Sequence, residues 1–416
     1  MKNVGIEAMN AFCGSAYLDV SELAEHRQLD AKRFANLLMK EKAVALPYED
    51  PITFGVNAAK PIIDQLSAEE KDRIEMVITC TESAFDFGKS MSTYYHKLLG
   101  LNRNCRLLEI KNACYSGTAG LQMAANFVLS EVSPGAKVLV IATDISRFLV
   151  TEGGEALSED WSFAEPSGGA GAVAMLVSDS PHVFQLDVGA NGYYGYEVMD
   201  TCRPVPDSEA GDADLSLLSY LDCCEQSFRE YQKRVADTDY ASSFGFLAFH
   251  TPFGGMIQGA HRTMMRKFMQ AKPDVIQADF ERRVLPGLLY CQRVGNIMGA
   301  TIALSLAGTI IHGDFSTPQR IGCFSYGSGC CSEFYSGIVT PEGRARLMDM
   351  GLEAQLDQRY RLTMAEYETI FAASGAVKFG TRNTILDASL VAEARQPGLL
   401  YLKEIKEFSR QYEWLL

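Results

Sequence analysis

The sequence predicts an α/β protein because short apolar, β-branched runs alternate along the chain with helical patterns. The runs are EMVITCTES, RLLEIKNAC, KVLVIATDIS, GAVAMLVSD, FGFLAFH and RIGCFSYGSG. Strands that are apolar almost throughout are typical of sheets covered by helices on both faces. We therefore expect a largely buried sheet in a layered core.

Three longer segments between these runs have helical patterns of about three turns or more. They are VNAAKPIIDQLSAEEKDR, SGTAGLQMAANFVLSEV and GNIMGATIALSLAGTIIH. The last two are rich in Ala and Gly, which favours close helix packing. No long linker and no repeat of 20–50 residues is visible. We predict two halves sharing one core, residues 1–180 and 181–416, with an insertion or helical flap near 192–240.

The composition favours a globular protein and argues against several classes of partner. The chain has 416 residues, 47% hydrophobic and 22% charged, as in ordinary globular proteins. It has neither a signal-peptide pattern at its start nor the ~18 consecutive apolar residues that span a bilayer. We expect a soluble cytoplasmic protein. The net charge of −14 argues against nucleic acid or an anionic membrane as a partner.

Eleven cysteines are scattered through apolar segments, and we interpret them as reduced thiols. The adjacent pairs Cys223–Cys224 and Cys330–Cys331 lack the CxxC spacing of zinc sites. No metal is therefore expected.

Cys114 has a sequence context that favours a nucleophile. In EIKNACYSGTAGLQMAA an apolar strand ends, a small-residue turn follows and a helix begins. The unpaired amides and positive end of a helix favour the thiolate form of a nearby cysteine. The same amides can hold the oxyanion of a thioester intermediate. A buried structural cysteine fits this local sequence about equally well.

Two further side chains follow predicted strands. Glu82 comes directly after EMVITC, at the end of a strand where α/β proteins often bind ligands. It could equally be a surface charge or lie beside a helix N-cap. His250 ends FGFLAFH before a glycine-bearing turn, a setting that suits a catalytic imidazole. The alternative is a hydrogen-bonded histidine of the core.

Asn296 and Ser328 are weaker candidates. Asn296 in VGNIMGATIAL is expected to begin a helix and offers an amide donor. Ser328 lies in a Gly-Ser-Gly turn whose backbone can approach a ligand closely.

Over most of its length the chain resembles the 3-hydroxy-3-methylglutaryl (HMG)-CoA synthase family of the thiolase superfamily. The resemblance rests on motifs that occur together in one order: KRFANLLMKEKAVALPYED, TES, NACYSGTAGL, IATDISRF, PSGGAGAVAMLV, FHTPFGGM, VGNIMGA and YGSG. It implies a five-layered αβαβα thiolase fold with two related halves, usually a homodimer.

The resemblance also implies a reaction without a tightly bound cofactor. Cys114 would accept an acetyl group from a thioester, and Glu82 would deprotonate its methyl group. His250 and Asn296 would orient the β-keto acceptor. The backbone amides of Cys114 and Ser328 would form an oxyanion hole, and water would release the product.

The sequence departs from the primary-metabolism members of the family after FHTPF. Those enzymes usually carry lysines there that meet coenzyme A phosphates, whereas this chain has Gly254, Gly255 and Met256. It looks more like the branch that serves polyketide β-branching, in which phosphopantetheine thioesters are delivered by donor and acceptor acyl carrier proteins. A primary HMG-CoA synthase using acetyl-CoA and acetoacetyl-CoA is the alternative.

Acidic carrier proteins would need local basic contacts on this acidic chain. Two clusters are candidates: Lys32 and Arg33, and Arg262, Arg266 and Lys267, of which 262 and 266 share a helix face. Ordinary solvated charges are the alternative for each cluster.

Two more distant functions remain. A Claisen-type ketosynthase of the same superfamily would not need Glu82, and a non-catalytic scaffold would need neither an activated nucleophile nor a base.

Overall fold

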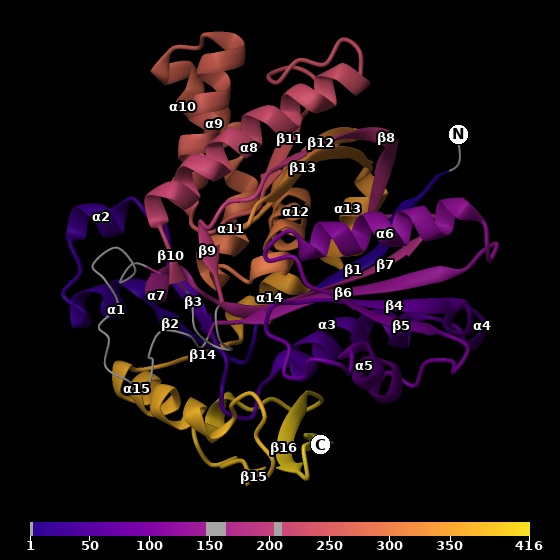
Figure 1. Cartoon of the computed structure of the whole chain (residues 1–416), viewed down its shortest axis with the longest axis vertical. Coiled ribbons are helices and arrows are strands. Elements are labelled where there is room, and N and C mark those ends of the chain that lie inside the picture. Colours follow the sequence, from indigo (N-terminus) through magenta and orange to yellow (C-terminus); the bar gives the residue numbers. More distant parts are fainter. Residues whose placement is uncertain (1–2, 147–163, 204–209) are drawn as a thin grey trace.

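The computed structural model describes residues 3–146, 164–203 and 210–416. In these residues nine strands join in one mixed sheet, in the order β11-β12-β13-β8-β1-β7-β6-β4-β5 (Figure 1). Their bounds along the sheet are Phe246–Phe249, Gln319–Gly327, Cys331–Val339, Phe184–Gly195, Gly5–Phe12, Ala170–Ser178, Lys137–Ile145, Ile74–Cys80 and Arg106–Ile110. The six strands expected from apolar runs are confirmed as β4, β5, β6, β7, β11 and β12.

Helices cover the sheet in layers, as Figure 1 shows. The helix α3 packs on β1, β6 and β7, and α6 packs on β4, β6 and β7 from the opposite face. The helix α12 contacts α6 and also β11 and β12, while α8 covers β8 and β13 from outside. These four helices span Pro51–Gln65, Ser116–Ser130, Thr301–His312 and Ala213–Arg234. The two halves of the sheet, β1 to β5 and β8 to β11, thus form two strand layers, with α6 and α12 between them, α3 outside the first and α8 outside the second. This is the αβαβα order expected.

The remaining helices and three small sheets complete the described part of the chain. The helices are α1 Val20–His26, α2 Ala31–Ala35, α4 Ala68–Asp72, α5 Ser92–Leu98, α7 Ala164–Ser167, α9 Gly254–Met269, α10 Pro273–Arg283, α11 Leu285–Val294, α13 Pro341–Met348, α14 Leu352–Asp357 and α15 Met364–Ala373, with 3₁₀ turns η2 Met298–Ala300, η3 Ser374–Ala376 and η4 Ala392–Ala394. The small sheets contain β2 Ala16–Asp19, β3 Glu41–Val44 and β14 Tyr360–Arg361; β15 Thr384–Ile385, β16 Leu400–Lys406 and β17 Ser409–Trp414; and β9 Thr201–Cys202 with β10 Ala210–Gly211.

Two helix predictions need correction. The pattern over residues 56–73 belongs to two helices, α3 and α4, because Ser67 caps the second one. Its hydroxyl accepts from the Glu70 amide, and the Glu70 carboxylate accepts from the Ser67 amide. Asn296 does not begin a helix. It lies in the turn before η2, and α12 starts only at Thr301.

The segment 192–240 is partly described, since residues 204–209 lie outside the described ranges. Its main element, α8, is packed on the sheet with Tyr220, Phe228 and Tyr231 buried. That this segment is an insertion, and that the chain divides near residue 180, stay predictions. In the described parts of the chain, none of the helices has both the length and the apolar character that crossing a membrane requires.

The direction of the strands gathers the candidate residues. The strands β4, β5 and β6 are parallel, so their carboxyl ends meet at one edge, where Glu82, Cys114 and Asp144 lie. In the other half of the sheet β11 and β12 are parallel, and they end directly before His250 and Ser328. Both sets of ends open toward one cavity.

Candidate active site

Cys114 lies in the turn between β5 and α6, two residues before the helix begins at Ser116. The preceding residue, Ala113, has φ 43°, a left-handed conformation that bends the chain sharply. The half-buried thiol of Cys114 donates to Glu82 Oε1 across 3.7 Å. The helix start and the neighbouring carboxylate therefore bring together a nucleophile, backbone amides and a base.

The two oxygens of Glu82 have different partners. Oε2 lies 3.2 Å from Nε of Arg203, and the Glu82 carbonyl accepts from Arg203 Nη1 at 3.0 Å. Both side chains are largely shielded from water, with 13% of Arg203 and 14% of Glu82 exposed. Because the guanidinium holds Oε2 and the backbone, Oε1 is directed toward Cys114. A carboxylate held in this way can move a proton next to a group bound on the sulfur.

Asp144 holds the backbone of Glu82 in place through hydrogen bonds. It is fully buried on β6, and its Oδ1 accepts from the Glu82 amide at 2.9 Å and from Ser83 Oγ at 2.8 Å. Burial, together with the negative charge of Glu82, raises the pKa of Asp144 to about 7. The Asp144 carboxyl therefore holds a proton over much of the range below neutral pH.

His250 faces the cavity from the end of β11 as a neutral imidazole. Its side chain is buried, and burial lowers its pKa to about 3. The backbone fixes its position, because the His250 amide donates to Phe324 O at 2.8 Å and its carbonyl accepts from Tyr220 Oη at 2.7 Å. Within the described residues Nδ1 has no hydrogen-bond partner. A neutral imidazole carries one N–H group, so the ring can donate a hydrogen bond to a ligand without adding a charge.

Asn296 and Ser328 also line the cavity. The Asn296 carboxamide oxygen accepts from the Met298 amide and from Thr301 Oγ1, each at 3.0 Å. This leaves its NH₂ group as the donor toward the cavity. The turn at Ser328 is held from below by buried Asp200, which accepts from the Gly329 amide at 2.9 Å.

The five predicted site residues, Cys114, Glu82, His250, Asn296 and Ser328, thus line one cavity of about 1090 Å³. Its wall is partly apolar, and the apolar part includes Phe85, Phe87, Leu217, Phe253, Met256 and Met298. A volume of this size is typical of sites that bind small organic molecules. No group of three or more His, Cys, Asp or Glu side chains in the described ranges could hold a metal ion.

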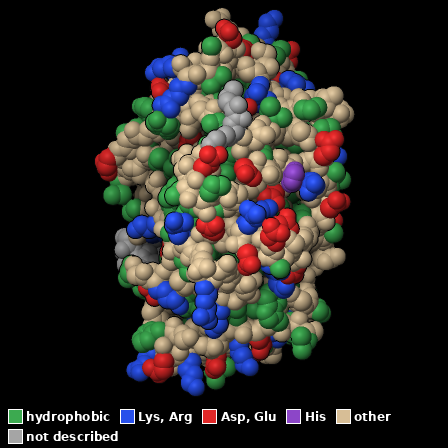
Figure 2. Space-filling view, turned by 90° about the vertical axis from the view of Figure 1, so that its right-hand side faces the viewer, with side chains coloured by type: hydrophobic (Ala, Val, Ile, Leu, Met, Phe, Trp, Pro, Cys, Tyr) green, Lys and Arg blue, Asp and Glu red, His purple; other side chains and the backbone are tan. Residues whose placement is uncertain are grey.

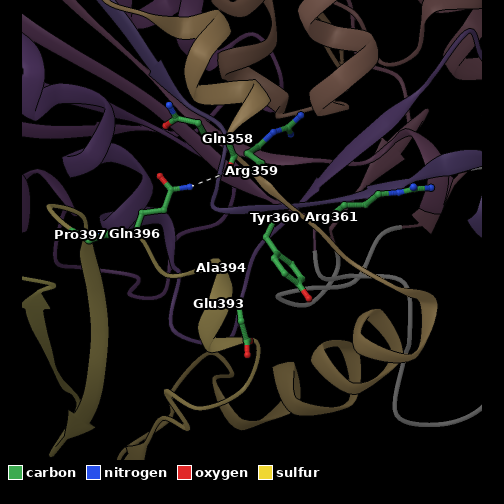
Figure 3. Close-up of a pocket in the computed structure, with 8 residues that line it drawn as sticks. All are labelled: Gln358, Arg359, Tyr360, Arg361, Glu393, Ala394, Gln396 and Pro397. Atoms are coloured by element: carbon green, nitrogen blue, oxygen red, sulfur yellow. Dashed lines mark hydrogen bonds between the residues drawn. The ribbon is translucent and has the colours of Figure 1, made fainter.

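A second hollow, of about 620 Å³, lies between β14 and η4 (Figure 3). Its two arginines are engaged elsewhere: Arg359 donates to Glu41 Oε2 at 2.6 Å, and Arg361 donates to Glu22 Oε1 at 2.5 Å. The hollow shares no described lining residue with the cavity around Cys114. We assign it no part in the chemistry.

Family comparisons agree with this geometry. The N-terminal hydroxymethylglutaryl-coenzyme A synthase model matches residues 1–181, and the C-terminal model matches residues 265–414. The chain belongs to the HMG-CoA synthase family. An HMG synthase is a carbon–carbon bond-forming acyltransferase, and this is the class of the present enzyme.

The chain is similar over its whole length, or nearly so, to individual relatives and to solved structures of the family. It is 68% identical to the polyketide biosynthesis 3-hydroxy-3-methylglutaryl-ACP synthase PksG of Bacillus subtilis, with both chains covered completely. It is 34% identical to a hydroxymethylglutaryl-CoA synthase of Enterococcus faecalis, covering 94% of this chain and 96% of that one. The curacin-pathway HMG synthase in complex with acetyl donor-ACP matches with a TM-score of 0.96 at 66% identity, over all of both chains.

The basic residues expected to meet a partner of this synthase divide into two groups. Arg33 lines the mouth of the cavity, and Lys32 is exposed beside it on α2. Arg262, Arg266 and Lys267 are exposed on α9 but do not line the cavity, and Lys267 is paired with Glu225. Figure 2 shows Lys and Arg side chains interspersed with Asp and Glu over the face in view.

Sequence reasoning missed three buried or half-buried residues of the site: Asp144, Asp200 and Arg203. Asp144 lies near the end of the run KVLVIATDIS, so its place beside Glu82 at the ends of parallel strands was a usable signal. Asp200 and Arg203 lie in the segment interpreted as an insertion, and no local pattern marks either residue. Cations that line the cavity and were not singled out also include Lys111, Lys378 and Arg410.

Proposed function

We propose that this enzyme is an HMG synthase of polyketide β-branching that acts on thioesters tethered to acyl carrier proteins. The observation that carries the proposal is the Cys114 thiol, 3.7 Å from Glu82 Oε1 in the same cavity as His250. Support for carrier-bound substrates comes from the 68% identity to an HMG-ACP synthase, compared with 34% to a CoA enzyme. Phosphopantetheine would therefore arrive with its carrier protein, and no tightly bound cofactor takes part.

In the first step Cys114 takes the acetyl group from the donor. The thiolate attacks the thioester carbonyl, the bond to the pantetheine sulfur breaks, and the proton lost from Cys114 goes to the released pantetheine thiol. The start of α6 two residues further along supports this step, because unpaired helix amides stabilise both the thiolate and the tetrahedral oxyanion.

In the second step Glu82 acts as the base. Its Oε1 removes a proton from the acetyl methyl group, and the carbanion adds to the ketone carbon of the acceptor. Arg203 supports this role, since it holds Oε2 and the backbone of Glu82 and keeps the carboxylate oriented. Glu82 then returns its proton to the alkoxide formed on the acceptor.

The acceptor ketone would be oriented by His250 and Asn296. A neutral imidazole and a carboxamide NH₂ group can each donate to the ketone oxygen without adding a charge to the cavity. The backbone amides of Cys114 and Ser328 are the proposed oxyanion hole for the enolate. Water finally adds to the Cys114 thioester, the cysteine sulfur leaves, and an HMG-type product remains on the acceptor carrier.

The partners in this proposal are an acidic donor and an acidic acceptor carrier protein. Arg33 at the mouth, with Lys32 beside it, is the first proposed contact, and Arg262 and Arg266 on α9 are the second. Lys267 was expected to join the second cluster. Its pairing with Glu225 makes it the weakest of the five.

We also propose a homodimer. In the described part of the sheet β5 is the terminal strand, and Leu107, Leu108 and Ile110 on it are half-buried. Such an edge is a natural place for pairing with another chain. Sedimentation velocity of the purified enzyme tests this, and a monomer at micromolar concentration would contradict it.

Intact-protein mass spectrometry tests the main proposal. The enzyme is mixed with acetyl-carrier protein or with acetyl-CoA, and the mass of the acetyl adduct is followed with time, with Cys114→Ala as the control. We expect faster labelling from the carrier protein and none in Cys114→Ala. After addition of acetoacetyl-carrier protein, the acceptor should gain one acetyl unit plus one water. Preference for acetyl-CoA would return the enzyme to primary metabolism.

A further inference from the structure

A cluster of charged and polar side chains surrounds Glu165 on α7, the short helix whose two end residues line the cavity. The Glu165 carboxylate accepts two hydrogen bonds from Arg27, each at 2.9 Å, and one from the Tyr367 hydroxyl at 3.0 Å. The backbone carbonyl of Glu165 accepts from Lys42 Nζ at 2.5 Å. Lys42, Glu165 and Tyr367 are all buried. We call these four residues the Glu165 cluster.

Charges in this place are costly for the fold. Burial lowers the pKa of Lys42 to about 8, because a charged ammonium group is poorly solvated there. Burial would raise the pKa of Glu165, but hydrogen bonds from Arg27 outweigh it and keep that pKa below its ordinary value. Buried ion pairs contribute little net stability, since desolvation offsets their attraction. What the cluster provides is a fixed position for Glu165, held from the end of α1, from β3 and from α15.

The chain that follows Glu165 is hydrogen-bonded to both backbone groups of Asn296. The Ser167 carbonyl accepts from the Asn296 amide at 2.7 Å, and the Gly169 amide donates to the Asn296 carbonyl at 2.9 Å. The two segments also touch backbone to backbone, because a Cβ atom on Gly169 would stand 2.2 Å from the carbonyl oxygen of Val294. Close packing transmits displacement, so neither segment can move without the other.

The side chain of Asn296 moves with its backbone. Its carboxamide oxygen is hydrogen-bonded to Met298 and Thr301, so the NH₂ group, the proposed donor to the acceptor ketone, has a direction set by this turn. The base Glu82 has a different support, since Arg203 holds both its carboxylate and its backbone. Acceptor binding and proton removal therefore depend on separate groups of contacts.

We propose that Lys42 is a positioning residue for the condensation step. With the rest of the Glu165 cluster it fixes residues 165–169, and through their backbone it holds the Asn296 carboxamide where the acceptor ketone is bound. Acetylation of Cys114 involves no acceptor and does not depend on Lys42. This inference rests on the role that the proposed function gives to Asn296, and it deepens that role.

Lys42→Met tests the inference, because methionine keeps an unbranched apolar side chain and removes the N–H groups. Lys137→Met is the matched control. Lys137 is a second buried lysine, paired with Glu7 at 2.5 Å, and neither is among the described residues that line the cavity. Intact-protein mass spectrometry follows two steps separately: acetylation of Cys114 from acetyl-carrier protein, and condensation with acetoacetyl-carrier protein at a series of acceptor concentrations.

We expect Lys42→Met to lower kcat/KM for the acceptor about tenfold or more, while its acetylation rate stays within about twofold of wild type. Lys137→Met should match wild type in both steps. In an Asn296→Ala background Lys42→Met should have little further effect on condensation, because the positioned group is already absent. Tyr367→Phe removes one hydrogen bond to Glu165 and keeps the ring, so it should show a smaller loss confined to the acceptor step.

Normal acceptor kinetics in Lys42→Met would overturn the inference. An equal loss in acetylation and condensation would also overturn it, because that result indicates a merely structural residue. So would a full loss repeated in the Asn296→Ala background, since Lys42 would then act through another group. If Lys42→Met does not fold, unchanged acceptor kinetics in Tyr367→Phe overturn the inference instead. Failure of the proposed function looks different: Asn296→Ala by itself would condense at the parental rate.

Discussion

Replacing Asp144 by Asn should make the stability of the protein less dependent on pH. Asp144 is fully buried, and its pKa of about 7 lies above the 3.8 of an ordinary aspartate. Between these two values the folded state binds more protons than the unfolded state. Stability therefore falls as pH rises through this window, and the loss is complete above the folded pKa.

The size of the effect follows from the same two values. A difference of about 3 pKa units, at 1.36 kcal/mol each, gives a penalty of about 4 kcal/mol when Asp144 is fully ionised. Part of the penalty is already present at pH 5, so the change between pH 5 and pH 8.5 is on the order of 3 kcal/mol. Asn has nearly the same shape, and its oxygen can keep the bonds from Ser83 and from the Glu82 amide.

The assay is chemical denaturation of wild type, Asp144→Asn and the exposed control Asp179→Asn at pH 5 and pH 8.5. Relative to wild type, Asp144→Asn should gain on the order of 3 kcal/mol of stability between the two pH values, whereas Asp179→Asn should gain little. If the difference between Asp144→Asn and wild type were the same at both pH values, the argument that Asp144 carries a burial penalty would be refuted.

Three further outcomes follow from the site. Glu82→Gln should still accept acetyl on Cys114 but lose condensation at least 100-fold, because an amide cannot take the methyl proton; condensation at the parental rate, measured by product mass, would remove Glu82 as the base. The pH–rate profile of condensation should show no break from His250 between pH 5 and 8, since its pKa of about 3 keeps it neutral there; a break near 6.5 that disappears in His250→Asn would contradict this. Tyr115→Phe removes a 2.6 Å hydrogen bond to buried Glu333. The change should lower the free energy of unfolding by about 1.5–3 kcal/mol, measured by denaturation. An unchanged stability would show that the bond contributes nothing.

The sequence by itself determined which segments form buried strands and which strand ends bear the candidate catalytic residues. Buried strands must be apolar almost throughout, so β4, β5, β6, β7, β11 and β12 were visible as runs. The polar residues that follow such runs, Glu82, Cys114 and His250, stand out for the same reason. A resemblance in ordered motifs was needed to connect them, because spacing along the chain does not say which strand ends meet.

Only the tertiary structure decided how those residues are held. Asp200 and Arg203 act through contacts with residues far away in the chain, such as Arg203 with Glu82, and no local period or composition signals such a partner. Asn296 was expected to begin a helix, but its carboxamide oxygen bonds ahead to Met298 and Thr301 and fixes the turn before η2 instead. From the sequence alone, Gly254 and Gly255 are notable only because related enzymes of primary metabolism usually carry lysines at this place. The structure shows why glycine is needed there: the backbone of Asn36 to Leu38 packs directly against α9 and leaves no room for a side chain. A contact between two such distant segments is not visible in the sequence.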